Sequence, residues 1–147
     1  MKNRLLFTTA LIAAAFAVSD ARAERLVVSS GEEEAVNAEM SANDNSELQG
    51  GAILNSGKLT VADGVVFNGN AGSVGGAVST VDASGAAVIG DNVSFIGNTS
   101  AMQGGAYHNQ RATSTICDNA KFHNNTAIGY GGGAVYQDTD GREAVLT

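Results

Sequence analysis

The sequence predicts an all-β protein, a right-handed single-stranded parallel β-helix of about three to four coils of ~27 residues, incomplete at its C-terminal end. Three observations predict this fold. Three phenylalanines recur 28 and 27 residues apart, and each is followed eight to ten residues later by Gly-Gly-Ala. Short β-favouring runs bounded by turn residues lie between these motifs. A fixed period of this length is typical of one structural unit that is stacked repeatedly.

The first 23 residues have the pattern of a secretory signal peptide. Lys2 and Arg4 precede an apolar run, and Ala21-Arg22-Ala23 is a small-x-small cleavage site. The apolar run is short for a transmembrane helix, which needs about 20 residues. We therefore expect residues 1–23 to be removed on export, and we expect no transmembrane segment in the mature chain.

Charge and cysteine content exclude several classes of function. Residues 24–147 keep five of the eight Lys and Arg and 14 of the 15 Asp and Glu, a formal net charge of −9. This acidity argues against nucleic acid or anionic lipid as a partner. Cys117 is the only cysteine, so no intrachain disulfide forms. It aligns with Ala62 and Gly90 in a small-residue position, and strand alternation turns the nearby His123 away from the Phe122 side. We predict no catalytic residue, cofactor or metal.

Residues 24–49 are expected to form an N-terminal cap or a degenerate first coil. Leu26-Val27-Val28 is typical of a strand. Residues 30–40 fit either a short helix with a capping box or a worn coil. Met40-Ser41-Ala42-Asn43 can stand for the Phe-x-x-Asn element, with Met in the apolar position.

Residues 50–147 contain the β-helix repeats, with about three short strands each. One strand follows Gly-Gly-Ala, a second is of the Leu-Thr-Val type, and a third ends in Phe. In-register stacking then places like residues above one another, ~4.8 Å apart. We expect an aromatic stack, an amide ladder of Asn in a left-handed turn, and glycine pairs that serve positive φ and close chain approach. The residues that the repeat assigns to these roles are Phe67, Asn70, Gly75, Gly76, Phe95, Asn98, Gly104, Gly105, Phe122, Asn125, Gly132 and Gly133. An aliphatic column is expected from Val61, Ile89, Ile116 and Leu146.

The pairing of Phe-x-x-Asn with Gly-Gly-Ala-[Ile/Val] over residues 40–147 resembles the repeat of the chlamydial polymorphic outer-membrane proteins. More broadly, it resembles the β-helical passengers of bacterial autotransporter adhesins. The resemblance implies an exported, surface-displayed β-helix that mediates adhesion, followed by a membrane barrel. Because the sequence stops in the middle of a repeat, we expect a passenger truncated before its translocator barrel. The expected location is the outer-membrane surface or the extracellular space, or the periplasm if the translocator is absent.

The expected function is that of a non-enzymatic passenger or adhesin-like module that binds a host or cell-surface ligand, protein or glycan. Variable loops carry binding on such scaffolds. The candidate loops are residues 55–57, 81–85, 108–111 and 138–142. Tyr107, Tyr130 and Tyr136 are candidate contacts, with partial burial on the coil flank as the alternative.

Two alternatives remain at this point. One is a polysaccharide-acting, pectate-lyase-like β-helix. Its acidic residues would be Asp63, Asp91 and Asp118, which stack in the predicted fold and either recruit Ca²⁺ or bond their own turn backbone. The other is a fragment without a function of its own, whose open last coil self-associates end to end.

Overall fold

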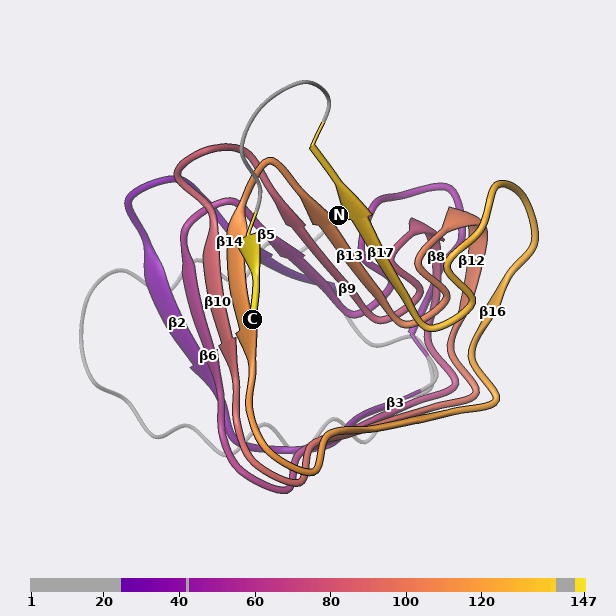
Figure 1. The fold of residues 1–147 in the computed structure, drawn as a ribbon, viewed down its shortest axis with the longest axis horizontal. Coiled ribbons are helices and arrows are strands. Elements are labelled where there is room, and N and C mark those ends of the chain that lie inside the picture. The colour runs from indigo at the N-terminus through magenta and orange to yellow at the C-terminus, as the bar shows by residue number, and fades with distance from the viewer. Residues whose placement is uncertain (1–24, 42, 140–144) are drawn as a thin grey trace, which may run out of the picture.

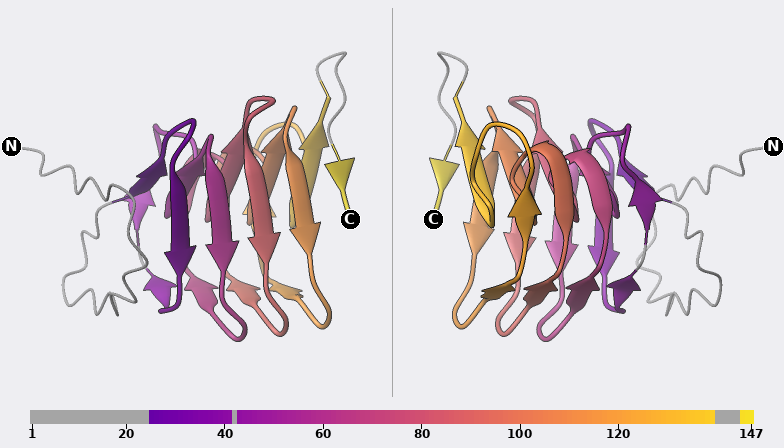
Figure 2. Two further views of the ribbon diagram at one scale, coloured as in Figure 1. Left: turned by 90° about the vertical axis from the view of Figure 1, so that its left-hand side faces the viewer. Right: turned by 90° about the vertical axis from the view of Figure 1, so that its right-hand side faces the viewer.

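The computed structural model describes residues 25–41, 43–139 and 145–147. The predicted signal peptide lies outside these residues. The strands are parallel and form a β-solenoid of about four turns with about 27 residues per turn, so the predicted fold class is confirmed. Figure 1 looks along the stack, and Figure 2 shows the coils side by side.

Four parallel sheets form the walls of the solenoid. Each of the first four coils contributes one strand to each sheet, and the chain then adds β17 and β18 to the first two sheets. Sheet A contains β1 (Leu26–Val28), β5 (Ile53–Asn55), β9 (Val78–Val81), β13 (Tyr107–Gln110) and β17 (Val135–Asp138). Sheet B contains β2 (Glu33–Val36), β6 (Lys58–Val61), β10 (Ala86–Ile89), β14 (Thr113–Ile116) and β18 (Val145–Leu146). Sheet C contains β3 (Met40–Ser41), β7 (Val66–Asn68), β11 (Ser94–Ile96) and β15 (Lys121–His123). Sheet D contains β4 (Asp44–Asn45), β8 (Ala71–Val74), β12 (Thr99–Gln103) and β16 (Thr126–Ala127).

Sheet D was not predicted, because the repeat pattern indicates only three strands. Its strands are built from small and polar residues such as Ala71-Gly72-Ser73, which have low intrinsic β propensity. Backbone pairing with the coils on either side, as between β8 and β12, holds them extended instead. Pairing with the neighbouring coils, rather than intrinsic β propensity, therefore makes this segment a strand.

The first segment is a coil of the stack. β2 pairs with β6, with Val36 opposite Val61, and β3 places Met40 opposite Phe67. The described residues contain no helix, so of the two expectations for residues 30–40 the worn coil is confirmed. Pairing with β6 gives the backbone N–H and C=O groups of this strand their hydrogen-bond partners. In a short helix, these groups would have to bond within the segment itself.

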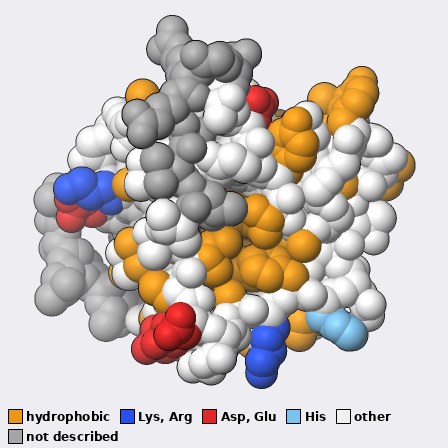
Figure 3. Space-filling model, in the orientation of Figure 1, with side chains coloured by type: hydrophobic (Ala, Val, Ile, Leu, Met, Phe, Trp, Pro, Cys, Tyr) orange, Lys and Arg blue, Asp and Glu red, His pale blue; other side chains and the backbone are white. Residues whose placement is uncertain are grey.

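The predicted aromatic stack fills the interior. The rings of Phe67 and Phe95 lie 4.9 Å apart at 8°, and those of Phe95 and Phe122 lie 4.9 Å apart at 2°. Phe67 and Phe95 are fully buried, and Phe122 is partly buried. In the view along the stack, apolar side chains gather in the middle of the ring of sheets (Figure 3).

The aliphatic column is confirmed for three of its four residues. Val61, Ile89 and Ile116 lie directly opposite one another in sheet B. Leu146 lies opposite Ser114 instead, so its placement in this column was wrong. The reason is loop length: six residues, 139–144, separate β17 from β18, whereas two, 111–112, separate β13 from β14. The longer connection shifts the register by two positions from the one expected.

The predicted amide ladder is also present. The Nδ2 of Asn70 donates to Asn98 Oδ1 (2.9 Å), and the Nδ2 of Asn98 donates to Asn125 Oδ1 (2.9 Å). Asn43 continues it into the first coil, donating to Asn70 Oδ1 at 2.7 Å. The ladder residues themselves are not left-handed, contrary to expectation. The residue before each one is: Gly69 (φ 65°), Gly97 (φ 61°) and Asn124 (φ 53°).

The two glycines of each pair serve separate purposes, as predicted. The first has positive φ, as at Gly75 (63°) and Gly104 (61°). The second lies against the next coil at Gly51, Gly76 and Gly105. The predicted close approach was wrong for Gly133, where a Cβ would meet only the Asn125 carbonyl oxygen at 3.6 Å. A Cβ on Gly76 would lie 2.0 Å from the carbonyl oxygen of Gly105, so only glycine fits.

Candidate functional site

The turns that join sheet A to sheet B stack along one edge of the solenoid, here called the A–B edge. They comprise residues 29–32, 56–57, 82–85, 111–112 and 139–144, of which 140–144 lie outside the described residues. Because the flanking strands pair in register, turns far apart in the sequence become neighbours (Figure 1). Of the predicted binding loops, 55–57 and 81–85 contain turns of this edge. Residues 108–110 of the third loop belong to β13, and residues 140–142 of the fourth lie outside the described residues.

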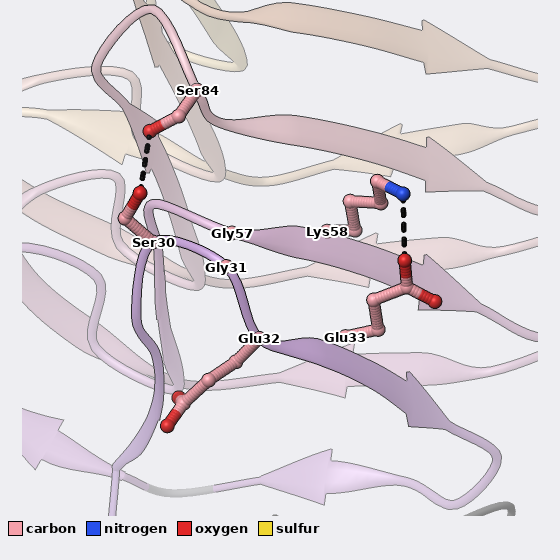
Figure 4. A pocket seen from close by; sticks show the side chains of 7 residues that line it. All are labelled: Ser30, Gly31, Glu32, Glu33, Gly57, Lys58 and Ser84. Atoms are coloured by element: carbon pink, nitrogen blue, oxygen red, sulfur yellow. Dashed lines mark hydrogen bonds and ion pairs between the residues drawn. The ribbon is translucent and has the colours of Figure 1, made fainter. Parts of the chain in front are cut away.

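A shallow groove of about 350 Å³ lies across the A–B edge in the first three coils (Figure 4). Its walls combine hydroxyl and charged groups: Ser30, Gly31, Glu32, Glu33, Gly57, Lys58 and Ser84. The Ser30 hydroxyl donates to Ser84 Oγ (3.2 Å), and the Ser84 hydroxyl donates to the Ser56 carbonyl (3.1 Å). The Glu32 carboxylate accepts the backbone N–H of Ser29 at 2.8 Å. These bonds connect turns of three successive coils.

Two charges at the groove, those of Lys58 and Glu33, are solvent-exposed and paired. Lys58 Nζ lies 2.6 Å from Glu33 Oε1, and this hydrogen bond raises the pKa of Lys58. Burial, followed by repulsion from Glu32, raises the pKa of Glu34. Further along the edge, Arg111 lies 3.4 Å from Asp82. An open groove of hydroxyls and exposed charges is suited to a polar ligand.

Some residues of the predicted binding loops point inward, so the prediction was wrong for them. Asn55 and Asn109 are fully buried. Asn55 Nδ2 donates to the Ala86 carbonyl (2.9 Å), and Asn109 Nδ2 donates to the Ala112 carbonyl (3.0 Å). Their amides thus satisfy backbone groups at the A–B edge, as buried polar groups require.

The three tyrosines have three different environments. Tyr107 is fully buried, and its hydroxyl lies 2.8 Å from Thr80 Oγ1 and 2.7 Å from Ser114 Oγ. Burial raises its pKa, and the prediction of a surface contact was wrong for this residue. Tyr136 is partly buried and stacks on His108 with centroids 5.8 Å apart. Tyr130 is 77% exposed, which leaves it free for contact.

The sequence reasoning missed one pair of chemically interesting residues. Ser79 and His108 lie opposite each other in sheet A, with Oγ 3.2 Å from Nδ1. Burial lowers the pKa of His108 to about 4, partly opposed by Asp138. A Ser–His contact is the arrangement of an activated nucleophile. Ser79, however, has no exposed surface and His108 only 2%, so the pair is closed to substrate. The alignment of the repeats was the signal that could have found it.

The acidic stack predicted at Asp63, Asp91 and Asp118 is present, but its bonding differs from the expectation. Asp63 Oδ1 accepts the backbone N–H of Asp91 (2.9 Å), and Asp91 Oδ1 accepts that of Asp118 (3.0 Å). The carboxylates of Asp63 and Asp91 therefore bond the next coil rather than their own turns. The part of the chain that the structure describes contains no group of three or more His, Cys, Asp or Glu arranged to hold a metal ion.

Cys117 occupies the small-residue position that the alignment predicts. Its backbone N–H donates to the Ile89 carbonyl, just as that of Gly90 donates to the Val61 carbonyl. His123 is exposed while Phe122 faces the interior, as alternation requires. Cys117 and His123 therefore occupy the positions that the alignment of the repeats predicts.

Comparison with models of protein families, with curated proteins and with solved structures gives no match to this chain. Across residues 25–41, 43–139 and 145–147, no helix has the length and apolar character needed to cross a membrane.

Proposed function

We propose that this chain is an exported, non-enzymatic β-helical passenger of the adhesin type, which binds a host or cell-surface ligand, protein or glycan, through its A–B edge. The observation that supports this most is the separation of scaffold from surface. The repeat's Phe, Asn and Gly residues contact each other from coil to coil, while the variable turns lie together outside.

The turns of the A–B edge differ in length from coil to coil, whereas the scaffold residues recur. They contain four residues at 29–32, two at 56–57, four at 82–85 and two at 111–112, between strands that keep their register. Rigid scaffolds that carry variable loops are a common way to build binding sites. The polar groove of Figure 4 lies on this surface.

Export is tested by fusing residues 1–23 to an alkaline phosphatase that lacks its own signal and is active only in the periplasm. We expect periplasmic activity in a Gram-negative host. Leu11→Arg places a charge in the apolar run, and we expect it to abolish this activity. Equal activity from both fusions would contradict the signal-peptide assignment.

Binding is tested with residues 24–147 coupled to fluorescent beads and applied to cultured epithelial cells. We expect saturable binding that Glu33→Ala/Lys58→Ala/Ser84→Ala lowers at least tenfold. The control variant Thr60→Ala/Val88→Ala changes exposed residues of sheet B away from the groove. Pretreating the cells with protease or with glycosidase distinguishes a protein from a glycan ligand. Equal binding of both variants would contradict the proposal.

The alternatives give different results with the same protein. Release of reducing ends from pectin or another acidic polysaccharide would favour the polysaccharide-acting alternative. Loss of a cooperative melting transition, with aggregation in light scattering, would favour the fragment that self-associates.

A further inference from the structure

Exposed apolar side chains form a ridge on the connections between sheet D and sheet A. This D–A ridge consists of Met102 (42% exposed), near the end of β12, and of Ile128 (72%) and Tyr130 (77%), in the connection from β16 to β17. The connections stack like the strands before them. The Ile128 N–H donates to the Ser100 carbonyl (3.0 Å), and the Tyr130 N–H donates to the Met102 carbonyl (2.8 Å). The ridge is therefore an ordered feature of the solenoid wall.

Exposure at the ridge comes from the shape of the coil. Ala101 and Met102 are exposed, and they lie in an irregularity of β12 between Ser100 and Gln103, outside the residues that pair in register with β8 and β16. The connection between β16 and β17, which carries Ile128 and Tyr130, projects outward beyond the sheets (Figure 1). In Figure 3, apolar side chains protrude on this side of the molecule among uncharged surface. The ridge is thus convex.

The ridge also lies in a part of the repeat that carries no charge in the second, third and fourth coils. Segments 64–81, 92–110 and 122–137 contain no Asp, Glu, Lys or Arg, although residues 24–147 carry a net charge of −9. Of these segments, only the last holds the most exposed residues, Ile128 and Tyr130, between the glycines 129 and 131. A charged or strongly polar partner would find nothing to pair with here.

A convex, uncharged, apolar tip can be covered only by a partner whose surface is concave or deformable. The groove on the A–B edge is lined by Glu32, Glu33 and Lys58, so this groove is not an apolar receptacle for the ridge. A lipid bilayer deforms around such a tip. Tyr is favoured at the headgroup level, and an aliphatic side chain beside it enters the acyl boundary. The backbone N–H groups of Ile128 and Tyr130 are already hydrogen-bonded, which lowers the cost of removing them from water.

We propose that the D–A ridge, led by Ile128 and Tyr130, inserts into the interface of a zwitterionic lipid bilayer. The net charge selects the lipid: an acidic chain is repelled by an anionic surface, and the repulsion is screened by salt. This binding goes beyond the proposed function, because it needs no protein or glycan receptor and uses a surface other than the A–B edge.

The first test is flotation of residues 24–147 with phosphatidylcholine vesicles. We expect the protein to float with the vesicles and Ile128→Ser/Tyr130→Ser to lower the partition coefficient at least tenfold. Tyr130→Trp should raise it several-fold, since Trp anchors at the interface more strongly, and a purely structural role would not predict this gain. Val88→Ser removes a comparably exposed apolar residue (45%) from sheet B and should change nothing.

The second test places an environment-sensitive NBD label on Ile128→Cys in a Cys117→Ser background. Its emission should shift to the blue and brighten with phosphatidylcholine vesicles, and should respond less with phosphatidylserine vesicles at low salt. The same label on Val88→Cys should not respond. Absence of flotation, an equal loss in Val88→Ser, or preference for phosphatidylserine would overturn the proposal. Because these vesicles carry no receptor, the result stands apart from that of the cell-binding experiment.

Discussion

At the scale of single residues, the amide of Asn98 explains why the motif requires asparagine. Its backbone N–H and its Nδ2 both donate to Asn125 Oδ1 (3.0 and 2.9 Å), and its Nδ2 also donates to the Phe67 carbonyl (3.0 Å). Its Oδ1 accepts the corresponding two bonds from Asn70. One buried side chain thus uses both donors and two acceptor positions to join three coils, which no other residue type of this size can do.

We therefore expect Asn98→Ala to be strongly destabilising. It leaves buried donors and acceptors of two neighbouring coils without partners, which costs about 3 kcal/mol of unfolding free energy or more. Urea denaturation followed by circular dichroism measures this. Asn68→Ala is the control, because Asn68 is exposed and surface changes usually cost less than about 0.5 kcal/mol. Equal losses from the two variants would show that the ladder contributes nothing specific.

The buried imidazole of His108 predicts a dependence of stability on pH. Burial lowers its pKa from 6.5 to about 4 in the folded state. Between these values the unfolded chain binds more protons, so stability is fully present above pH 6.5 and falls as the pH drops towards 4. A shift of this size corresponds to a full loss on the order of 3 kcal/mol. Comparing urea midpoints at pH 7 and 4.5 for the wild type and His108→Gln isolates this group, because the carboxylates are common to both. If His108→Gln kept the same dependence of stability on pH as the wild type, the prediction would be refuted.

At the scale of the element, each strand is short and gains its order from the coils above and below. A Cβ on Gly76 would meet the Gly105 carbonyl oxygen and the backbone of Thr99, which belong to the next coil. We expect Gly76→Ala to push the coils apart and to cost more than about 3 kcal/mol. Gly69→Ala is the matched control, since Gly69 has positive φ (65°) but open space around it. That change should cost only about 1 kcal/mol for the strained backbone. Melting temperatures distinguish the two, and the prediction fails if Gly69→Ala is the more harmful.

Elements with strong side-chain signals could be predicted from the sequence, and elements held by backbone pairing could not. The aromatic, aliphatic and amide columns follow from like residues at a fixed period. Sheet D lacks such a signal, because Ala71-Gly72-Ser73 is extended only through its neighbours. Leu146 was misplaced because the length of a turn determines register, and residue type alone does not reveal it. In the candidate site, the position of the turns was predictable, whereas the inward amides of Asn55 and Asn109 depend on the facing strand.

At the scale of the whole molecule, the solenoid is a one-dimensional stack in which each coil contacts only its neighbours. Its stability is then approximately a sum of coil and interface contributions. The chain has no disulfide to add to this sum, because Cys117 is its single cysteine. Stability is therefore expected to depend most on side chains that take part in two interfaces at once.

Phe95 is such a residue, and Phe122 is its matched counterpart. Phe95 stacks on the rings of both Phe67 and Phe122 and meets Tyr107 edge-on at 6.3 Å, whereas Phe122 contacts one ring and is only partly buried. We expect Phe95→Ala to cost about 4 kcal/mol of unfolding free energy, and Phe122→Ala about half of that. Urea unfolding should also show a lower m-value for Phe95→Ala, because weakening two adjacent interfaces divides the cooperative unit. If both variants lose the same free energy with unchanged m-values, the coils do not unfold as a nearest-neighbour stack, and stability is distributed over the molecule as a single unit.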